Sequence, residues 1–175
     1  LIKFNERIKV NGEEISDSDL VRLTIKIKEV CENNKIGATF FEFTTAIAFL
    51  YFAEKNIDYA VIETGLGGRL DATNVLNPEI SVITNIGIDH TKHLGDTKEK
   101  IAIEKAGIIK NNSLVITGEN DSTILDIFRN VCQDKESKLH ILNEELSFDL
   151  VTSDLGGQEF FVSGMVEGTF KIKML

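Results

Sequence analysis

The chain has 175 residues, of which 42% are hydrophobic and 27% charged, as expected for a globular protein with its own core. A net charge of −9 argues against a nucleic-acid-binding surface, which needs clustered lysine and arginine. No apolar run of about 18 residues is present, so no membrane span is predicted. The two cysteines, Cys31 and Cys132, lack metal or redox spacing and predict reduced thiols in a cytoplasmic protein.

The first 56 residues predict a strand, a turn and two helices. Residues 4–10 alternate like a strand, and the Asn-Gly pair at 11–12 is typical of a turn. Ser16 resembles a helix cap, and apolar residues then recur at helical spacing up to about Asn33. A second helix is predicted from about 41 to 56. This helix is apolar nearly all round, so we expect it to be buried between layers.

Strands and helices then alternate along the chain as far as residue 134. Short apolar strands are predicted at 59–62, 80–84 and 114–117, and helices at 97–106 and 122–134. Unbroken apolar strands between helices are typical of a sheet that is covered on both sides. We therefore predict an α/β fold, with a mostly parallel sheet and helices on both faces.

The pattern changes near Lys138, where the predicted helices end. Four short strands with turns between them are predicted at 138–142, 146–151, 158–162 and 169–175. We therefore expect a small antiparallel β region from about 138 to 175.

Polar side chains follow two strands of the predicted parallel sheet. Glu63 comes directly after the strand at 59–62, and His90 follows the strand at 80–84 by a few residues. Ligands gather at the carboxyl ends of such strands, and a carboxylate near an imidazole suits a divalent cation. On spacing alone, an equal alternative is that Glu63 caps a helix and His90 makes a loop hydrogen bond.

Gly65 and Gly67 resemble the start of a dinucleotide-binding fingerprint, but Leu70 stands where its third glycine belongs. We therefore prefer a permissive turn that lets the backbone approach a neighbour closely.

Lys105 lies in the predicted helix at 97–106, next to Ala106 and a further apolar run. The ordinary interpretation is a surface lysine. A lysine on a buried face, by contrast, needs a partner or a changed charge.

Three long motifs resemble those of the folylpolyglutamate and dihydrofolate synthases, which belong with the Mur ligases. They occur in the family's order at 63–74 (ETGLGGRLDATN), at 84–97 (TNIGIDHT, then LGDT) and at 101–110 (IAIEKAGIIK). Residues 4–12 match as well, and the resemblance is strong as far as about residue 118. It implies that residues 1–175 are part of the central, ATP-binding domain of such a ligase.

The resemblance implies an ATP- and Mg²⁺-dependent amide ligase that adds L-glutamate to dihydropteroate, folate or folylpolyglutamate. ATP phosphorylates a carboxylate to an acyl phosphate, which the amino group of glutamate then attacks, while Mg²⁺ neutralises charge on the transferring phosphoryl group. We expect a cytoplasmic protein, monomeric at full length. Its expected partners are these small molecules, and neither nucleic acid nor membrane.

The resemblance also assigns residues. Glu63 and His90 align with magnesium ligands. Lys105 aligns with a lysine that is carbamylated in the family, a modification that turns the cationic side chain into an anion. These three are the expected catalytic residues. Two further segments align with pterin-binding ones, and their residues are Thr39, Phe40, Phe41, Glu42, Leu70, Asp71 and Ala72. An aromatic ring stacks on a flat pterin, and a carboxylate accepts hydrogen bonds from pterin N–H groups.

The phosphate-binding loop of the family is absent from the sequence, in which no Gly-Lys pair occurs. We therefore expect the chain to be part of a longer protein, without the phosphate loop and C-terminal domain, and to be inactive alone. One alternative is a Mur-type ligase for a cell-wall precursor, although residues 69–74 favour folate. The other is a non-catalytic domain that binds pterin without using ATP.

Overall fold

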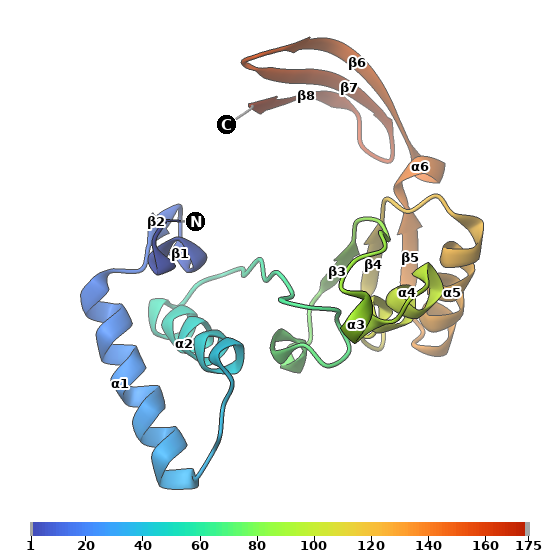
Figure 1. Ribbon diagram of the computed structural model, residues 1–175. Helices are drawn as coiled ribbons and strands as arrows, with labels where there is room; N and C mark the ends of the chain where they lie inside the picture. The colour runs from blue at the N-terminus through green and yellow to red at the C-terminus, as the bar shows by residue number, and fades with distance from the viewer. Residues whose placement is uncertain (1, 174–175) are drawn as a thin grey trace. The chain divides into compact units, whose positions relative to one another are not determined.

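The computed structural model describes residues 2–173, without the side chains of His93 and Asn143. The chain divides into two compact units (Figure 1). The first comprises the residues up to Leu66 together with Asp71–Leu76, and the second comprises Gly67–Leu70 and the residues from Asn77 onward. No described helix is both long and apolar enough to cross a membrane.

The first unit begins with a short helical turn and a small hairpin. The 3-10 helix η1 (Phe4–Arg7) precedes β1 (Lys9–Val10), which pairs antiparallel with β2 (Glu13–Glu14) around the predicted turn. The strand predicted over residues 4–10 is wrong for residues 4–7. The Glu6 carboxylate there accepts the N–H groups of Ile2 and Lys3, a local pattern that competes with strand pairing.

Two capped helices complete the core of the first unit. α1 (Asp17–Asn34) begins at Ser16, whose hydroxyl accepts the N–H of Asp19, which confirms the predicted cap. α2 (Phe40–Lys55) packs beside α1 (Figure 1). The buried side chains of this core are Ile8, Ile15, Leu23, Ile47 and Tyr51.

The expectation that α2 is buried between layers is wrong for the described residues. Only Thr45, Ile47 and Tyr51 of this helix are buried, and Phe40 is 73% exposed. The cause is that α1 and the hairpin core cover one side of α2 within its unit. An all-round apolar pattern shows that a helix avoids water, but it does not show which elements cover it.

The strand predicted at 59–62 is also wrong. These residues are irregular, no described strand pairs with them, and Val61 is 100% exposed. A strand requires a neighbour that supplies the other half of its hydrogen bonds. Further along, the 3-10 helix η2 (Ala72–Val75) ends the first unit.

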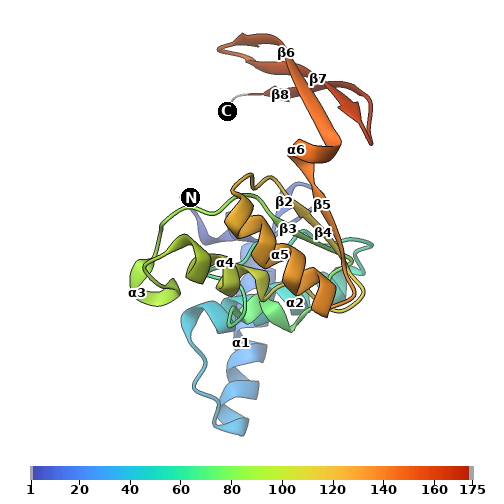
Figure 2. The same cartoon turned by 90° about the vertical axis from the view of Figure 1, so that its right-hand side faces the viewer.

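The second unit contains a three-stranded parallel sheet, as predicted. Its strands β3 (Ile80–Ile83), β4 (Leu114–Thr117) and β5 (Lys138–Ile141) lie in this order. The helices α4 (Lys98–Ala106) and α5 (Ser122–Asp134) connect neighbouring strands and pack side by side over the sheet (Figure 2). The predicted α/β architecture is therefore confirmed.

The core of the second unit lies between one face of this sheet and the two helices. In β3, Ser81 and Ile83 are buried on this face, whereas Ile80 and Val82 on the other face are 49% and 56% exposed. The apolar side chains of the core come from both layers and include Ile83, Val115, Ile101, Ala102, Ile124 and Phe128. That helices cover the second face of the sheet stays a prediction.

A separate antiparallel sheet follows the short helix α6 (Leu142–Glu145). It consists of β6 (Leu146–Asp154), β7 (Gly157–Gly164) and β8 (Gly168–Lys173), paired in that order. The antiparallel region is thus confirmed, but its predicted start near Lys138 is wrong, because residues 138–141 form β5 and pair in parallel with β4. Residues 174 and 175, predicted as the end of the last strand, lie outside the described residues. That both units form one central domain stays a prediction.

Candidate functional site

The two predicted magnesium ligands are exposed loop residues. Glu63 lies in the first unit, after the irregular segment 59–62, and His90 lies in the second unit at the start of the short helix α3 (Thr91–Leu94). His90 has a left-handed backbone, with φ of 50°. Its Nε2 lies 3.6 Å from Oδ2 of Asp89, and its N–H donates to Asp89 Oδ1 at 2.6 Å.

The carboxylates at these two positions in the chain suit Mg²⁺ by their chemistry. Carboxylate oxygens are the ligands that Mg²⁺ prefers, and one or two carboxylates commonly suffice because water and phosphate oxygens occupy the other positions. Glu63 supplies one exposed carboxylate, and Asp89, which was not predicted as a ligand, supplies a second beside His90. Among the described residues, no three His, Cys, Asp or Glu side chains gather into a complete metal site.

Lys105 lies half-buried near the carboxyl end of α4, where the glycine-rich turn of residues 67–70 contacts the helix. Arg69 donates to the Glu104 carboxylate with Nη2 at 2.9 Å and to the Glu104 carbonyl with its backbone N–H at 2.8 Å. A Cβ at Gly68 would lie 2.7 and 2.8 Å from the carbonyl oxygens of Glu104 and Lys105. The turn therefore requires glycine at this position, and it fixes the backbone around Lys105. The carbamylation of Lys105 stays a prediction.

The predicted pterin-binding residues Phe41 and Asp71 contact neighbouring residues of one turn in the first unit. A Cβ at Gly65 would lie 2.7 and 2.8 Å from Cε1 and Cε2 of Phe41, so the ring packs against the Gly65 backbone. Asp71 Oδ2 accepts the N–H of the next residue, Leu66, at 2.8 Å. The close approach expected of the glycine turn is therefore observed at Gly65, and its partner is Phe41.

The Asp71 carboxylate is buried and makes several hydrogen bonds within the protein. Its Oδ1 accepts the N–H of Thr73 at 2.9 Å and the Thr73 hydroxyl at 2.5 Å, in addition to the bond from Leu66 to Oδ2. A carboxylate has about four acceptor positions. Asp71 therefore closes the turn and keeps about one acceptor position for a ligand.

The other predicted pterin residues differ in exposure. Thr39 and Glu42 form a capping box, in which each side chain binds the backbone N–H of the other, so they fix the start of α2. Phe40 packs edge-on against Phe4 at 6.2 Å between ring centroids. Leu70 is exposed and Ala72 is half-buried.

Glu119 is a buried acid at the carboxyl end of β4 that was not predicted. Its Oε2 accepts the N–H of Ile86 at 2.7 Å, and its Oε1 accepts those of Asn120 at 2.8 Å and Asp121 at 3.0 Å. Burial raises the pKa of this carboxyl, but the three N–H donors lower it further, so that the Glu119 pKa lies below its usual value. The rule that selected Glu63, an acid just after a strand, also points to Glu119.

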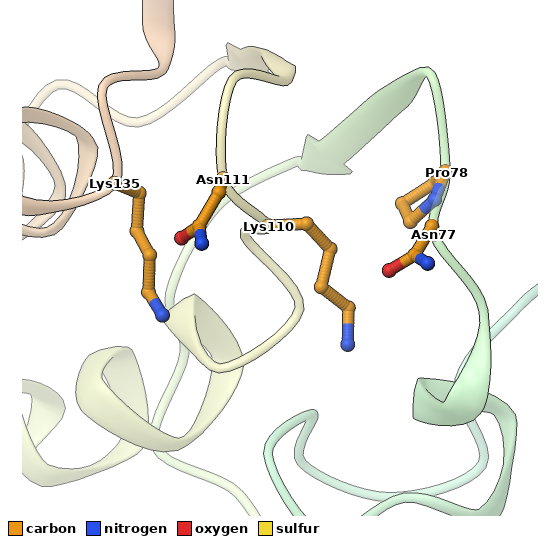
Figure 3. A pocket seen from close by; sticks show the side chains of 5 residues that line it. All are labelled: Asn77, Pro78, Lys110, Asn111 and Lys135. Carbon is orange, nitrogen blue, oxygen red and sulfur yellow. The ribbon is translucent and has the colours of Figure 1, made fainter.

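The pocket drawn in Figure 3 lies elsewhere on the second unit. It has a volume of about 360 Å³ and is lined by Asn77, Pro78, Lys110, Asn111 and Lys135. These residues precede β3, β4 and β5, whereas Glu119 and His90 follow the opposite, carboxyl ends of strands. None of the predicted site residues lines it, so we do not assign the site to this pocket.

A sequence model of the Mur ligase middle domain matches residues 14–174. The dihydrofolate synthase/folylpolyglutamate synthase of Bacillus subtilis is 48% identical over 134 residues, which cover 74% of this chain and 31% of that protein. The crystal structure of folylpolyglutamate synthase from Thermotoga maritima superposes with a TM-score of 0.84 at 38% identity, over 97% of this chain and 39% of that one.

A complex of folylpolyglutamate synthase with AMPPCP and folate superposes with a TM-score of 0.87 at 34% identity, over 94% of this chain and 41% of that one. The chain spans about a third of the length of the curated relative described above. The fold, the ordered motifs and the match over residues 14–174 together show that this chain belongs to the Mur ligase middle-domain family.

Proposed function

We propose that this chain is part of an ATP-dependent ligase that adds L-glutamate to dihydropteroate, folate or folylpolyglutamate. The observation that carries the proposal is the turn at Gly65 and Leu66, which brings Phe41 and Asp71 to adjacent residues. Support also comes from the relatives, which are named as synthases of this kind, and from a solved relative that holds both AMPPCP and folate.

The pterin ring binds at this turn in our proposal. The Phe41 ring packs on Gly65, and the residue is 38% exposed, which leaves part of it open for stacking. Asp71 accepts one hydrogen bond from a pterin N–H group at its remaining acceptor position. The capping box of Thr39 and Glu42 holds the first turn of α2, and with it Phe41, in place.

Glu63 and His90 hold Mg²⁺ in the proposed enzyme, with Asp89 as a further carboxylate beside His90. When bound, Mg²⁺ neutralises charge on the phosphoryl group that passes from ATP to the substrate carboxylate. Lys105, as a carbamate, supplies an additional anion near the turn at 67–70.

The proposed reaction has two steps. A substrate carboxylate oxygen attacks the γ-phosphorus of ATP, which forms an acyl phosphate and releases ADP. The amine of glutamate then attacks the acyl carbon, which forms an amide and releases phosphate and a proton. The residues of this chain bind and orient the pterin end of the substrate, so that its carboxylate is presented for the first step.

The proposal is tested by titrating dihydropteroate into the full-length protein that carries this chain. We expect Phe41→Ala to weaken binding about 10-fold, since stacking of a base on an aromatic ring contributes ~1–3 kcal/mol. Tyr59→Ala is the matched control, because it removes an exposed aromatic ring outside the turn.

Two results would argue against the proposal. Equal affinities of the wild type and Phe41→Ala would rule out stacking at this turn. Dihydropteroate binding without any phosphate release from ATP in the full-length protein would favour a pterin-binding domain without ligase activity.

A further inference from the structure

We propose that Glu119 is a positioning residue that fixes the loop between β3 and His90. The inference rests on the proposed magnesium role of His90. It concerns a buried acid whose carboxylate accepts backbone N–H groups, and which acts on His90 through the backbone.

Two hydrogen bonds tie the start of this loop to the residues that follow β4. The N–H of Gly118 donates to the carbonyl of Thr84 at 2.9 Å, and the N–H of Ile86 donates to Glu119 Oε2 at 2.7 Å. A Cβ at Gly118 would lie 3.0 Å from the Thr84 oxygen, so a residue without a side chain suits this approach. The loop is therefore held at two points, the second of them four residues before His90.

Glu119 is itself held rigidly. Its Oε1 accepts the N–H groups of Asn120 and Asp121, and its own N–H donates to the Thr117 hydroxyl at 3.1 Å. Ile86, on the other side, is 3% exposed and packs in the core of the second unit. The bond between Glu119 and Ile86 therefore connects one fixed group to another, and it limits the directions in which the loop leaves β3.

The sheet itself does not need this carboxylate. The four residues of β3 pair with the four residues of β4 through backbone hydrogen bonds, and the pairing ends at Ile83 and Thr117. Glu119 lies beyond that point, and what it adds is the geometry of the loop. At a metal site, groups that orient a ligand affect affinity without touching the ion.

A glutamine at this position tests the role because it changes one feature of the contact. Both oxygens of Glu119 accept backbone N–H groups, and bonds to a charged acceptor are the strong ones. The amide of glutamine has one oxygen and one NH₂ group. Its NH₂ group therefore faces backbone N–H donors where Glu119 has an oxygen, and the hydrogen bonds on that side are lost.

The experiment uses the full-length protein that carries this chain, in four forms: wild type, Glu119→Gln, His90→Ala and Glu79→Gln. Glu79 is the matched control, because it is an exposed glutamate directly before the amino end of β3. Hydrogen exchange is followed for residues 85–90 and for β4, and Mg²⁺ is titrated calorimetrically. We expect Glu119→Gln to speed exchange in residues 85–90 but not in β4, and to weaken Mg²⁺ binding about 10-fold, the lower end of the range for lost supporting contacts.

The outcomes separate the two proposals. Unchanged exchange in residues 85–90, or faster exchange in β4 as well, would overturn the positioning role. Faster loop exchange in Glu119→Gln with unchanged Mg²⁺ affinity would also overturn the positioning role. In that case, weaker Mg²⁺ binding by His90→Ala would still support the proposed magnesium role of His90. If His90→Ala bound Mg²⁺ as the wild type does, the magnesium role of His90 and the positioning role would both be refuted.

Discussion

The ring of Phe41 in α2 packs against the backbone of Gly65, so closely that a Cβ at position 65 would lie 2.7 Å from Cε1 of the ring. The following residue, Leu66, donates its N–H to Asp71. An aromatic ring and a carboxylate that are 30 positions apart in the sequence are thus placed by two consecutive residues.

Gly65→Ala is expected to displace the Phe41 ring. Forcing a methyl group into a packed contact costs about 1–3 kcal/mol, and a displaced ring no longer presents its exposed part to a pterin. We expect a lower free energy of unfolding in urea and weaker dihydropteroate binding. Gly37→Ala is the control, because nothing lies within 4 Å of a Cβ at that position. Equal effects of the two substitutions would contradict the packing explanation.

Asp71→Ala is expected to destabilise the turn, because it leaves the buried N–H of Thr73 and the N–H of Leu66 without their acceptor. Loss of a buried partner costs about 1–3 kcal/mol. Asp126→Ala removes only an exposed ion pair to Arg129 and should change stability far less. Urea unfolding of both variants measures the difference. Dihydropteroate titration of Asp71→Ala also tests a direct pterin contact, which equal affinities would argue against.

Glu119 is expected to make stability sensitive to acid. Burial raises its pKa in the folded protein, but three N–H donors, with a smaller contribution from Lys98, together outweigh burial and hold the pKa below the usual value of 4.5. The folded state therefore binds the proton less tightly than the unfolded state does. The resulting stabilisation is complete above the unfolded pKa and is lost as the pH falls through the folded pKa.

Urea unfolding between neutral pH and about pH 3 checks this expectation. The stability difference between the wild type and Glu119→Gln should be constant well above pH 4.5 and should shrink below it. A difference that stayed constant over the whole acid range would show that the carboxylate charge contributes nothing.

Lys105 is expected to carry a carbamate only when cations are bound nearby. It lies in the last turn of α4, where the helix dipole favours a cation over an anion. A carbamate there needs compensation, which Mg²⁺ would supply. In ¹³C-bicarbonate we expect a carbamate NMR signal that grows with Mg²⁺ and nucleotide. The signal should persist in Lys110→Arg and vanish in Lys105→Arg; its persistence in the latter would assign it to another lysine.

The 175-residue chain alone is expected not to turn over ATP. Catalysis of phosphoryl transfer depends on a loop that positions the phosphates, and the sequence contains no Gly-Lys pair of the kind such loops use. Phosphate release with dihydropteroate and glutamate present, compared between this chain and the full-length protein, measures this. Turnover by the chain at the full-length rate would show that the phosphate site lies within these residues.

The sequence predicted correctly those features that depend only on residues close together in the chain. The hydroxyl of Ser16 caps α1, as predicted, and α5 has its predicted bounds. Each of these features depends on side chains within a few residues of the helix end. The same is true of the turn at 11–12.

Features that depend on a distant partner were not predictable. Residues 59–62 and 138–142 were both predicted as short strands, yet the first segment is irregular and residues 138–141 of the second join the parallel sheet. The site shows the same limit. The family resemblance predicts Asp71 as a pterin ligand, but its bonds to Leu66 and Thr73 appear only in the fold. The rule that selected Glu63 also points to Glu119, but the bond to Glu119 from Ile86, 33 positions away, appears only in the fold.

The division into two units has a consequence for how the chain can be cut. The polypeptide passes between the units after Leu66, after Leu70 and after Leu76, all within the segment that includes the glycine-rich turn. Neither unit is therefore encoded by one continuous stretch of gene. On the ribosome, the first unit lacks its last piece until Leu76 has been made, by which time four residues of the second are already in the chain. Cleavage within residues 67–70 would leave Asp71–Leu76, which belong to the first unit, on the same fragment as most of the second unit. We therefore expect cleavage there to impair both units.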